Sequence, residues 1–243
     1  MRLYDDVLRQ MQALLPPAAT KRSPYRAKQC APEGEKDALL FRADTAYELG
    51  GSGKQSAQAV LFADFPGQES GTLLYGPDLD EISADVPFGH ITIVRLKGTD
   101  DAALTSEQLK TIAFTVFQLY PKGYHIRISP ISCREQVRVA KTALQGPMPL
   151  SFLQIGNSLI RAFLLHPDVA AVKTVFITDP GFDYKALSAL CGKAKQITDA
   201  VQSTLGLSEL DCSTCSMKPV CDEIDGLREL HLKREGLTME GNN

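Results

Sequence analysis

Apolar residues recur every three or four positions along several stretches of the chain, which is the spacing of one face of a helix. Near the N-terminus this pattern includes Leu3, Val7 and Met11, and Pro16 and Pro17 end it. Similar patterns predict helices over residues 105–120, 133–144, 151–166 and 182–204, and a short polar helix is expected over 222–234.

Other stretches are rich in β-branched and aromatic residues and are bounded by turn residues, as β-strands are. Strands are predicted at residues 39–49, 57–65, 89–96, 124–131 and 172–179. The first two flank the glycine-rich loop 50–56 and together predict a β-hairpin. A Gly-Pro-Asp turn is expected at residues 76–78. Residues 18–37 show neither pattern, so we expect an irregular basic segment that lies across the surface.

The order of these elements, strands first and then helices alternating with strands, predicts the fold class. It is typical of an α+β fold, a mixed sheet layered with helices, here with a C-terminal cysteine knuckle. We expect three segments. Residues 1–37 would hold the N-terminal helix and the basic irregular segment, 38–205 the α+β domain, and 206–243 the knuckle and a terminal helix.

The composition is that of an ordinary globular protein and argues against several functional classes. Of the 243 residues, 44% are apolar and 23% charged, and the net charge is −3. This balance gives no general reason to expect nucleic acid binding, and no apolar run approaches the ~18 residues of a membrane span. Asp5, Asp6 and Arg9 interrupt the N-terminal apolar pattern, which argues against a signal peptide. Three of the six cysteines lie close together, so we expect a reducing, cytoplasmic location instead of a disulfide scaffold.

Three cysteines near the C-terminus carry most of the chemical information in the sequence. Cys212, Cys215 and Cys221 form a C-x₂-C-x₅-C knuckle whose neighbours are mostly polar. Soft thiolates from one short segment suit an iron–sulfur cluster or zinc. A structural zinc site usually takes two such pairs, or a cysteine pair with a histidine pair, so a 4Fe–4S cluster is favoured here. Zinc and free or redox-active thiols remain as alternatives.

A fourth cluster ligand would have to come from elsewhere in the chain, or from a non-protein ligand. Cys30 lies in a polar, basic segment where packing does not explain a cysteine, and it is the favoured candidate. His231 follows Cys221 by ten residues and is the second candidate. Cys191 shares a helical apolar pattern and is expected to be a core residue, whereas Cys133 opens a predicted helix.

Several segments, taken in order, resemble the CO dehydrogenase/acetyl-CoA synthase beta subunit family. They are LYGPDLDEISADVPFGHITIV (74–94), FTVFQLYPKGYHIRIS (114–129), VKTVFITDP (172–180) and DCSTCSMKPVC (211–221). The resemblance covers roughly residues 39–231 and depends on the order of the segments and the position of the cysteines. It implies that the region 38–205 is similar to the middle domain of that enzyme.

In that family a C-x₂-C pair begins the cysteines that bind the active-site iron–sulfur cubane. The resemblance therefore implies that Cys212, Cys215 and Cys221 are cluster ligands, with Cys215 at the position that bridges towards nickel. The family's third cysteine lies further along, and His231 stands where its fourth cysteine would be. The Cys-Gly-Cys motif that binds nickel in the family does not occur in this sequence. We therefore expect a stand-alone relative that keeps a cluster without the complete nickel site.

Two functional hypotheses follow. The first is an iron–sulfur protein with an accessory role in anaerobic one-carbon or CO metabolism, in electron transfer, assembly or regulation. Its partners would be proteins of the CO dehydrogenase/acetyl-CoA synthase pathway or a redox partner. The alternative is a zinc-stabilised interaction module that docks onto a larger enzyme complex. The sequence indicates no catalytic residue and does not decide whether the protein is an enzyme.

Basic residues also cluster around the junction between the strand at 124–131 and the helix predicted at 133–144. They are Lys122, Arg127, Arg134, Arg138 and Lys141. Guanidinium groups at such a junction could bind the phosphates of coenzyme A or another anion, but a solvated basic helix face is the simpler interpretation.

Overall fold

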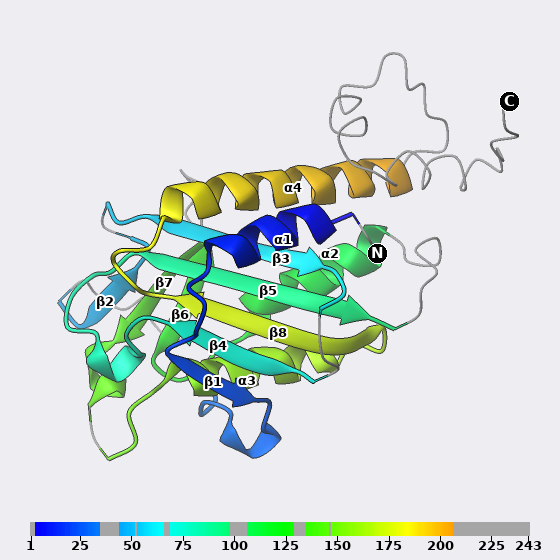
Figure 1. Cartoon of the computed structure of the whole chain (residues 1–243). Coiled ribbons are helices and arrows are strands. Elements are labelled where there is room, and N and C mark those ends of the chain that lie inside the picture. Colours follow the sequence, from blue (N-terminus) through cyan, green and yellow to red (C-terminus); the bar gives the residue numbers. More distant parts are fainter. Residues whose placement is uncertain are drawn as a thin grey trace, which may run out of the picture.

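The computed structural model describes residues 3–34, 44–51, 53–65, 69–97, 106–128, 135–145 and 147–206, and these residues form two β-sheets and four helices (Figure 1). The larger sheet contains β1 (Lys21–Pro24), β3 (Ser56–Phe62), β4 (Gly71–Tyr75), β5 (Phe88–Leu96) and β8 (Val169–Ile177). The smaller sheet contains β2 (Ala46–Leu49), β6 (Tyr124–Ile128) and β7 (Glu135–Ala140). The helices are α1 (Asp5–Leu14), α2 (Ser106–Ala113), α3 (Phe152–Leu164) and α4 (Tyr184–Gly206). Short 3₁₀ turns are η1 (Ala27–Gln29), η2 (Leu79–Glu81), η3 (Phe114–Gln118) and η4 (Lys141–Leu144).

The larger sheet is mixed, with the strand order β1-β4-β8-β5-β3. Strands β4 and β8 run parallel, as do β3 and β5, whereas β5 and β8 at the centre pair antiparallel. The smaller sheet is antiparallel, in the order β2-β7-β6. The structure thus confirms the predicted mixed sheet layered with helices, while the cysteine knuckle lies outside the described residues.

Helices cover different strands on the two faces of the larger sheet. Helix α3 packs against β4 and β8, and the rings of Phe152 and Phe176 lie 4.7 Å apart in this layer. Helix α4 packs on the other side against β3, and α1 packs on α4 (Figure 1). On this second side no described helix lies over β1, β4 and β8. We call the α3 side the closed face, and the uncovered part of the other side the open half.

Helices predicted from apolar spacing are confirmed where one side of the helix is buried. The helix predicted at 151–166 is α3, which begins with a capping box between Ser151 and Gln154 that satisfies the first backbone N–H groups. The helices predicted at the N-terminus and at 182–204 are α1 and α4. The helix predicted at 105–120 is α2, continued by the 3₁₀ turn η3. None of the described helices combines the length and the apolar character needed to cross a membrane.

The predicted helix at 133–144 is wrong, because its described part contains strand β7 followed by η4. Val137 and Val139 are buried, and Arg138 between them pairs with Glu48 of β2. This alternation has a period of two, which is the period of a strand. The basic residues of this stretch therefore do not form a helix face.

The hairpin predicted around the loop 50–56 is also wrong. Strand β2 pairs with β7, whereas β3 pairs with β5, so the two strands belong to different sheets. The loop connects the sheets, and Gly50 adopts a positive φ of 70° within it.

The irregular segment predicted at residues 18–37 contains a strand that the sequence analysis missed. Strand β1 pairs antiparallel with β4 and forms an edge of the larger sheet. Its four residues, Lys-Arg-Ser-Pro, lack an apolar alternation, and Pro24 is compatible with an edge position. Helix α1 and strand β1 therefore belong to the same layered unit as the strands that follow.

Candidate functional site

The predicted cluster ligands divide into those that the structure describes and those that it does not. Cys212, Cys215, Cys221, His231 and Cys133 lie outside the described residues. Within the described ranges the free cysteines are Cys30 and Cys191. The same ranges contain no group of three or more His, Cys, Asp or Glu side chains that could hold a metal ion. The knuckle therefore remains a prediction from the sequence, and the geometry bears only on the other ligand candidates.

Cys191 does not fit a ligand position. It lies on α4 within the hydrophobic core and is 9% exposed. Burial raises the pKa of its thiol to about 12, so the thiolate that would bind iron or zinc is strongly disfavoured. The prediction that Cys191 is a core residue is confirmed.

Cys30 has a different environment. It directly follows η1 and is half-buried, and its Sγ donates a hydrogen bond to the Ala27 carbonyl oxygen at 3.3 Å. Burial raises the pKa of nearby Tyr25, the negative form of Cys30 raises it further, and the cation of Arg161 opposes both. Cys30 therefore lies near polar and charged groups at the surface and not in the hydrophobic core.

The backbone on both sides of Cys30 is fixed to α3 by two buried side chains. Asn157 accepts a hydrogen bond from the Arg26 backbone N–H at 3.0 Å and donates one to the Gln29 carbonyl at 3.1 Å. Ser158 accepts one from the Ala31 backbone N–H at 2.9 Å. Both side chains are 2% exposed, so these bonds are shielded from water. The thiol is therefore held at a defined place beside α3.

A small cavity of about 250 Å³ lies next to this segment. Arg161 of α3 lines it and donates a hydrogen bond to Glu33 at 2.7 Å. Gly34 also lines it, and its N–H donates to the Tyr120 carbonyl at 2.6 Å. The groups identified around this cavity are thus paired with each other and do not converge on an empty position.

The Gly-Pro-Asp turn that contributes to the family resemblance has a structural explanation. Gly76 has a φ of 105°, which side chains rarely adopt. The Asp78 carboxylate accepts hydrogen bonds from the backbone N–H groups of Leu79 at 2.8 Å and Phe152 at 2.7 Å, and from Lys21 Nζ at 3.0 Å. The turn thereby joins β4 to the start of α3 and to β1. The motif does not by itself indicate a catalytic site.

Two of the basic residues considered for anion binding also have structural partners. Arg138 donates two hydrogen bonds to Glu48 Oε1, one of them from Nε at 2.6 Å. Lys141 Nζ donates to the Asp44 carbonyl at 2.9 Å and lies 4.9 Å from the ring centre of Tyr47. Both cations therefore fix β7 and its extension against the region of β2, and Arg134 lies outside the described residues.

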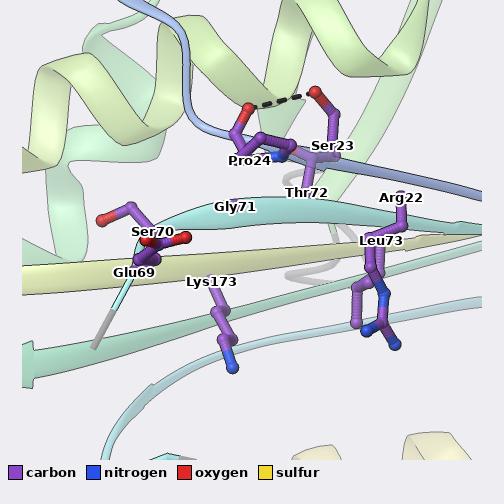
Figure 2. A pocket seen from close by; sticks show the side chains of 9 residues that line it. All are labelled: Arg22, Ser23, Pro24, Glu69, Ser70, Gly71, Thr72, Leu73 and Lys173. Carbon is purple, nitrogen blue, oxygen red and sulfur yellow. Dashed lines mark hydrogen bonds between the residues drawn. The ribbon is translucent and has the colours of Figure 1, made fainter. Parts of the chain in front are cut away.

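A group of residues with basic side chains, which the sequence analysis missed, lies on the open half of the large sheet. A cavity of about 680 Å³ is lined by residues of β1, β4 and β8, among them Arg22, Leu73 and Lys173. Figure 2 shows these three side chains extending to the same side of the sheet, away from the Ser23 side chain. We call this cavity the cationic hollow. Lys173 interrupts an apolar strand sequence, and this isolated cation is the feature of the sequence that could have indicated the site.

Comparison of the sequence with protein-family models and with curated proteins gives no match. The resemblance to the acetyl-CoA synthase family therefore stays a hypothesis based on the segments quoted above.

Proposed function

We propose that the protein binds an iron–sulfur cluster through Cys212, Cys215 and Cys221. In this proposal it is a relative of the CO dehydrogenase/acetyl-CoA synthase beta subunit with an accessory role in anaerobic one-carbon or CO metabolism. The observation that carries the proposal is the placement of three cysteines within ten residues among polar neighbours. Packing in a core does not account for cysteines in such surroundings, whereas soft-metal binding does.

The described residues support part of the ligand assignment. Cys191 is disfavoured because its thiol is buried and has a raised pKa. Cys30 is accessible and is held beside α3 by Asn157 and Ser158. A ligand held in place before binding loses less conformational entropy when the metal binds. Cys30 is therefore the preferred fourth ligand, and His231 is the alternative.

The chemistry of a bound cluster would be electron transfer or, at an iron without a protein ligand, the binding of a small molecule. The hydroxyl groups of Ser213, Thr214 and Ser216 stand next to the three cysteines in the sequence. Hydrogen bonds from such groups to cluster sulfur would raise its reduction potential.

A zinc-stabilised interaction module is the second candidate function. It is favoured by one feature of the sequence, namely that the three cysteines with His231 make up a Cys₃His ligand set. In that case the knuckle would be structural, and the surface of the protein would bind a partner complex.

Metal analysis of protein purified without oxygen separates the two functions. The cluster proposal predicts about four irons and four acid-labile sulfides per chain, with broad absorption near ~400 nm. Cys212→Ser, Cys215→Ser and Cys221→Ser should each lose most of the iron, whereas the matched control Cys191→Ala should retain it. Protein that contains one zinc and no sulfide would support the interaction module. Protein that contains neither metal would contradict both functions.

The fourth ligand is tested with the same assay. Cys30→Ser and His231→Gln are compared with the Cys191→Ala control, and iron retention and the electron paramagnetic resonance spectrum of the reduced protein are measured. We expect loss of iron or an altered spectrum in Cys30→Ser alone. A change in His231→Gln alone would show that the C-terminal segment supplies all four ligands.

A further inference from the structure

The cationic hollow lies on the open half of the large sheet and is independent of the cysteine knuckle. Its floor consists of β1, β4 and β8, and its volume is about 680 Å³. This volume falls within the range of sites that bind small molecules. The side chain of Leu73 is half-buried and supplies an apolar surface at the floor.

Three cations from three strands surround this part of the sheet. Arg22 lies on β1, Lys173 on β8 and Arg95 on β5. The buried ring of Phe65 holds two of them, because Lys173 Nζ lies 4.6 Å and Arg95 Cζ 5.4 Å from its centre. The cations are therefore held near one another by the fold, on strands whose positions are fixed by the sheet ladder.

The electrostatic environment of Lys173 is positive. Burial lowers the pKa of its ammonium group, and the charges of Arg22 and Arg95 lower it further. Glu69 is the carboxylate in the lining; it is exposed, and Figure 2 places it at the start of β4. A bound anion would offset the repulsion that Arg22 and Arg95 exert on Lys173.

We propose that the cationic hollow binds the phosphate group of a small phosphorylated metabolite. Guanidinium groups match the oxygens of a phosphate with paired hydrogen bonds, and an ammonium group adds a compact charge. Two cations in the lining, with Arg95 nearby, suit a dianion better than a single carboxylate, which carries one charge. Because the hollow is larger than a phosphate, the remaining space beside Leu73 accommodates an organic part. The protein as a whole carries a net charge of −3, so this positive region is local.

Titration of the full-length protein with inorganic pyrophosphate, followed by ³¹P NMR at constant ionic strength, tests the proposal. We expect saturable binding to the wild-type protein. Arg22→Gln and Lys173→Met should each weaken binding roughly tenfold, because each removes a charge-assisted contact. Lys193→Gln removes an exposed lysine on α4, away from the hollow, and serves as the matched control with unchanged affinity. Arg22 is exposed, so its variant keeps the test valid even if Lys173→Met folds poorly.

Several results would overturn the proposal. Absence of saturable binding to the wild-type protein would do so, as would an equal loss of affinity in all three variants, which would indicate non-specific charge attraction. A third contradictory result concerns lipid headgroups. If vesicles of phosphatidylglycerol bound the protein more tightly than pyrophosphate at equal phosphate concentration, and both hollow variants lost that binding, a small metabolite would be the wrong ligand. None of these outcomes depends on whether the cysteines bind a cluster.

Discussion

The two faces of the large sheet are formed by the same strands but differ in how their side chains are buried. On β8, Thr174 and Phe176 point to the closed face and are 0% exposed, whereas Lys173, the residue before Thr174, points to the open half and is partly exposed. On β4, the Thr72 side chain is buried towards α3, while the Leu73 side chain extends to the same side as Arg22 and Lys173 (Figure 2). The difference shows that alternation along a strand can separate a packed core from a ligand-accessible surface within one residue step.

The polar residues of the closed face are mainly structural. His90 Nε2 lies 3.1 Å from the hydroxyl oxygens of both Thr92 and Thr174, and its ring stacks 4.9 Å from Phe176. These groups are buried and satisfy each other, as polar groups in a core normally do. A buried histidine of this kind needs no functional explanation, in contrast to the partly exposed cations of the open half.

The largest expected difference between the faces concerns packing. Phe176→Ala would remove a fully buried ring from the closed face and should lower the free energy of unfolding by about 3–5 kcal/mol. Leu73→Ala on the open half should cost about 1 kcal/mol or less, since Leu73 is already partly exposed. Urea denaturation of both variants measures these values. Equal losses would show that the open half is packed as tightly as the closed face, contrary to the structure.

A second prediction concerns the contact between α3 and the sheet. A Cβ at Gly156 would collide with the Thr72 hydroxyl and would lie 3.0 Å from Thr174 Cγ2. Gly156→Ala should therefore destabilise the protein by about 1–3 kcal/mol. In the double variant Gly156→Ala/Thr72→Ala the colliding atoms are gone, so part of the loss should be recovered. A double-mutant cycle of unfolding free energies measures the coupling, and strictly additive effects would argue against this contact.

A third prediction concerns how stability depends on pH at α4, the helix that covers part of the second face. The thiol pKa of Cys191 is 9.0 when exposed and is raised to about 12 by burial. The unfolded chain therefore loses this proton at lower pH than the folded chain, and stability should fall between about pH 9 and 12. Tyr4 contributes in the same direction, because burial raises its pKa to about 12.

Cys191→Ala should make this alkaline decline less steep, as measured by thermal melting at successive pH values. Leu190→Ala, a truncation on the same helix without an ionisable group, is the matched control and should leave the slope unchanged. An unchanged slope in the Cys191 variant would mean that this thiol ionises freely in the folded protein.

The smallest effect is expected at the cationic hollow itself. Arg22→Gln should change the free energy of unfolding by no more than about 0.5 kcal/mol, because Arg22 is exposed on an edge strand. Urea denaturation without added phosphate tests this. A loss of more than about 2 kcal/mol would mean that Arg22 has a structural role, and that its use as a binding probe is unsound.

The local sequence pattern was sufficient to predict those helices and strands whose buried positions are apolar. Helix α3 combines apolar spacing with a Ser151 cap, and strands β5 and β8 are rich in β-branched and other apolar residues. The local pattern could not predict which strands pair with each other. Strand β2 pairs with β7, which lies about ninety residues later, so the predicted hairpin with its neighbour β3 was wrong. Strand β7 alternates Val137, Arg138 and Val139, and the alternation was overlooked in favour of a helix.

The candidate sites were predictable to different degrees. The knuckle cysteines were found because their spacing is a local signal, and Cys191 was correctly assigned to the core by its helical neighbours. The cationic hollow was missed because Arg22, Arg95 and Lys173 are far apart in the sequence. They come together only because β8 inserts between β4 and β5. No spacing rule within a single segment could have linked them.

The position of β8 also has a consequence for synthesis of the chain. Strands β4 and β1 form one pair, β3 and β5 form another, and β8 lies between the two pairs. A nascent polypeptide that has not yet reached Val169 therefore holds two separate ribbons with vacant hydrogen-bonding edges, which are prone to wrong association. The five strands can close into one sheet only after β8 has emerged from the ribosome.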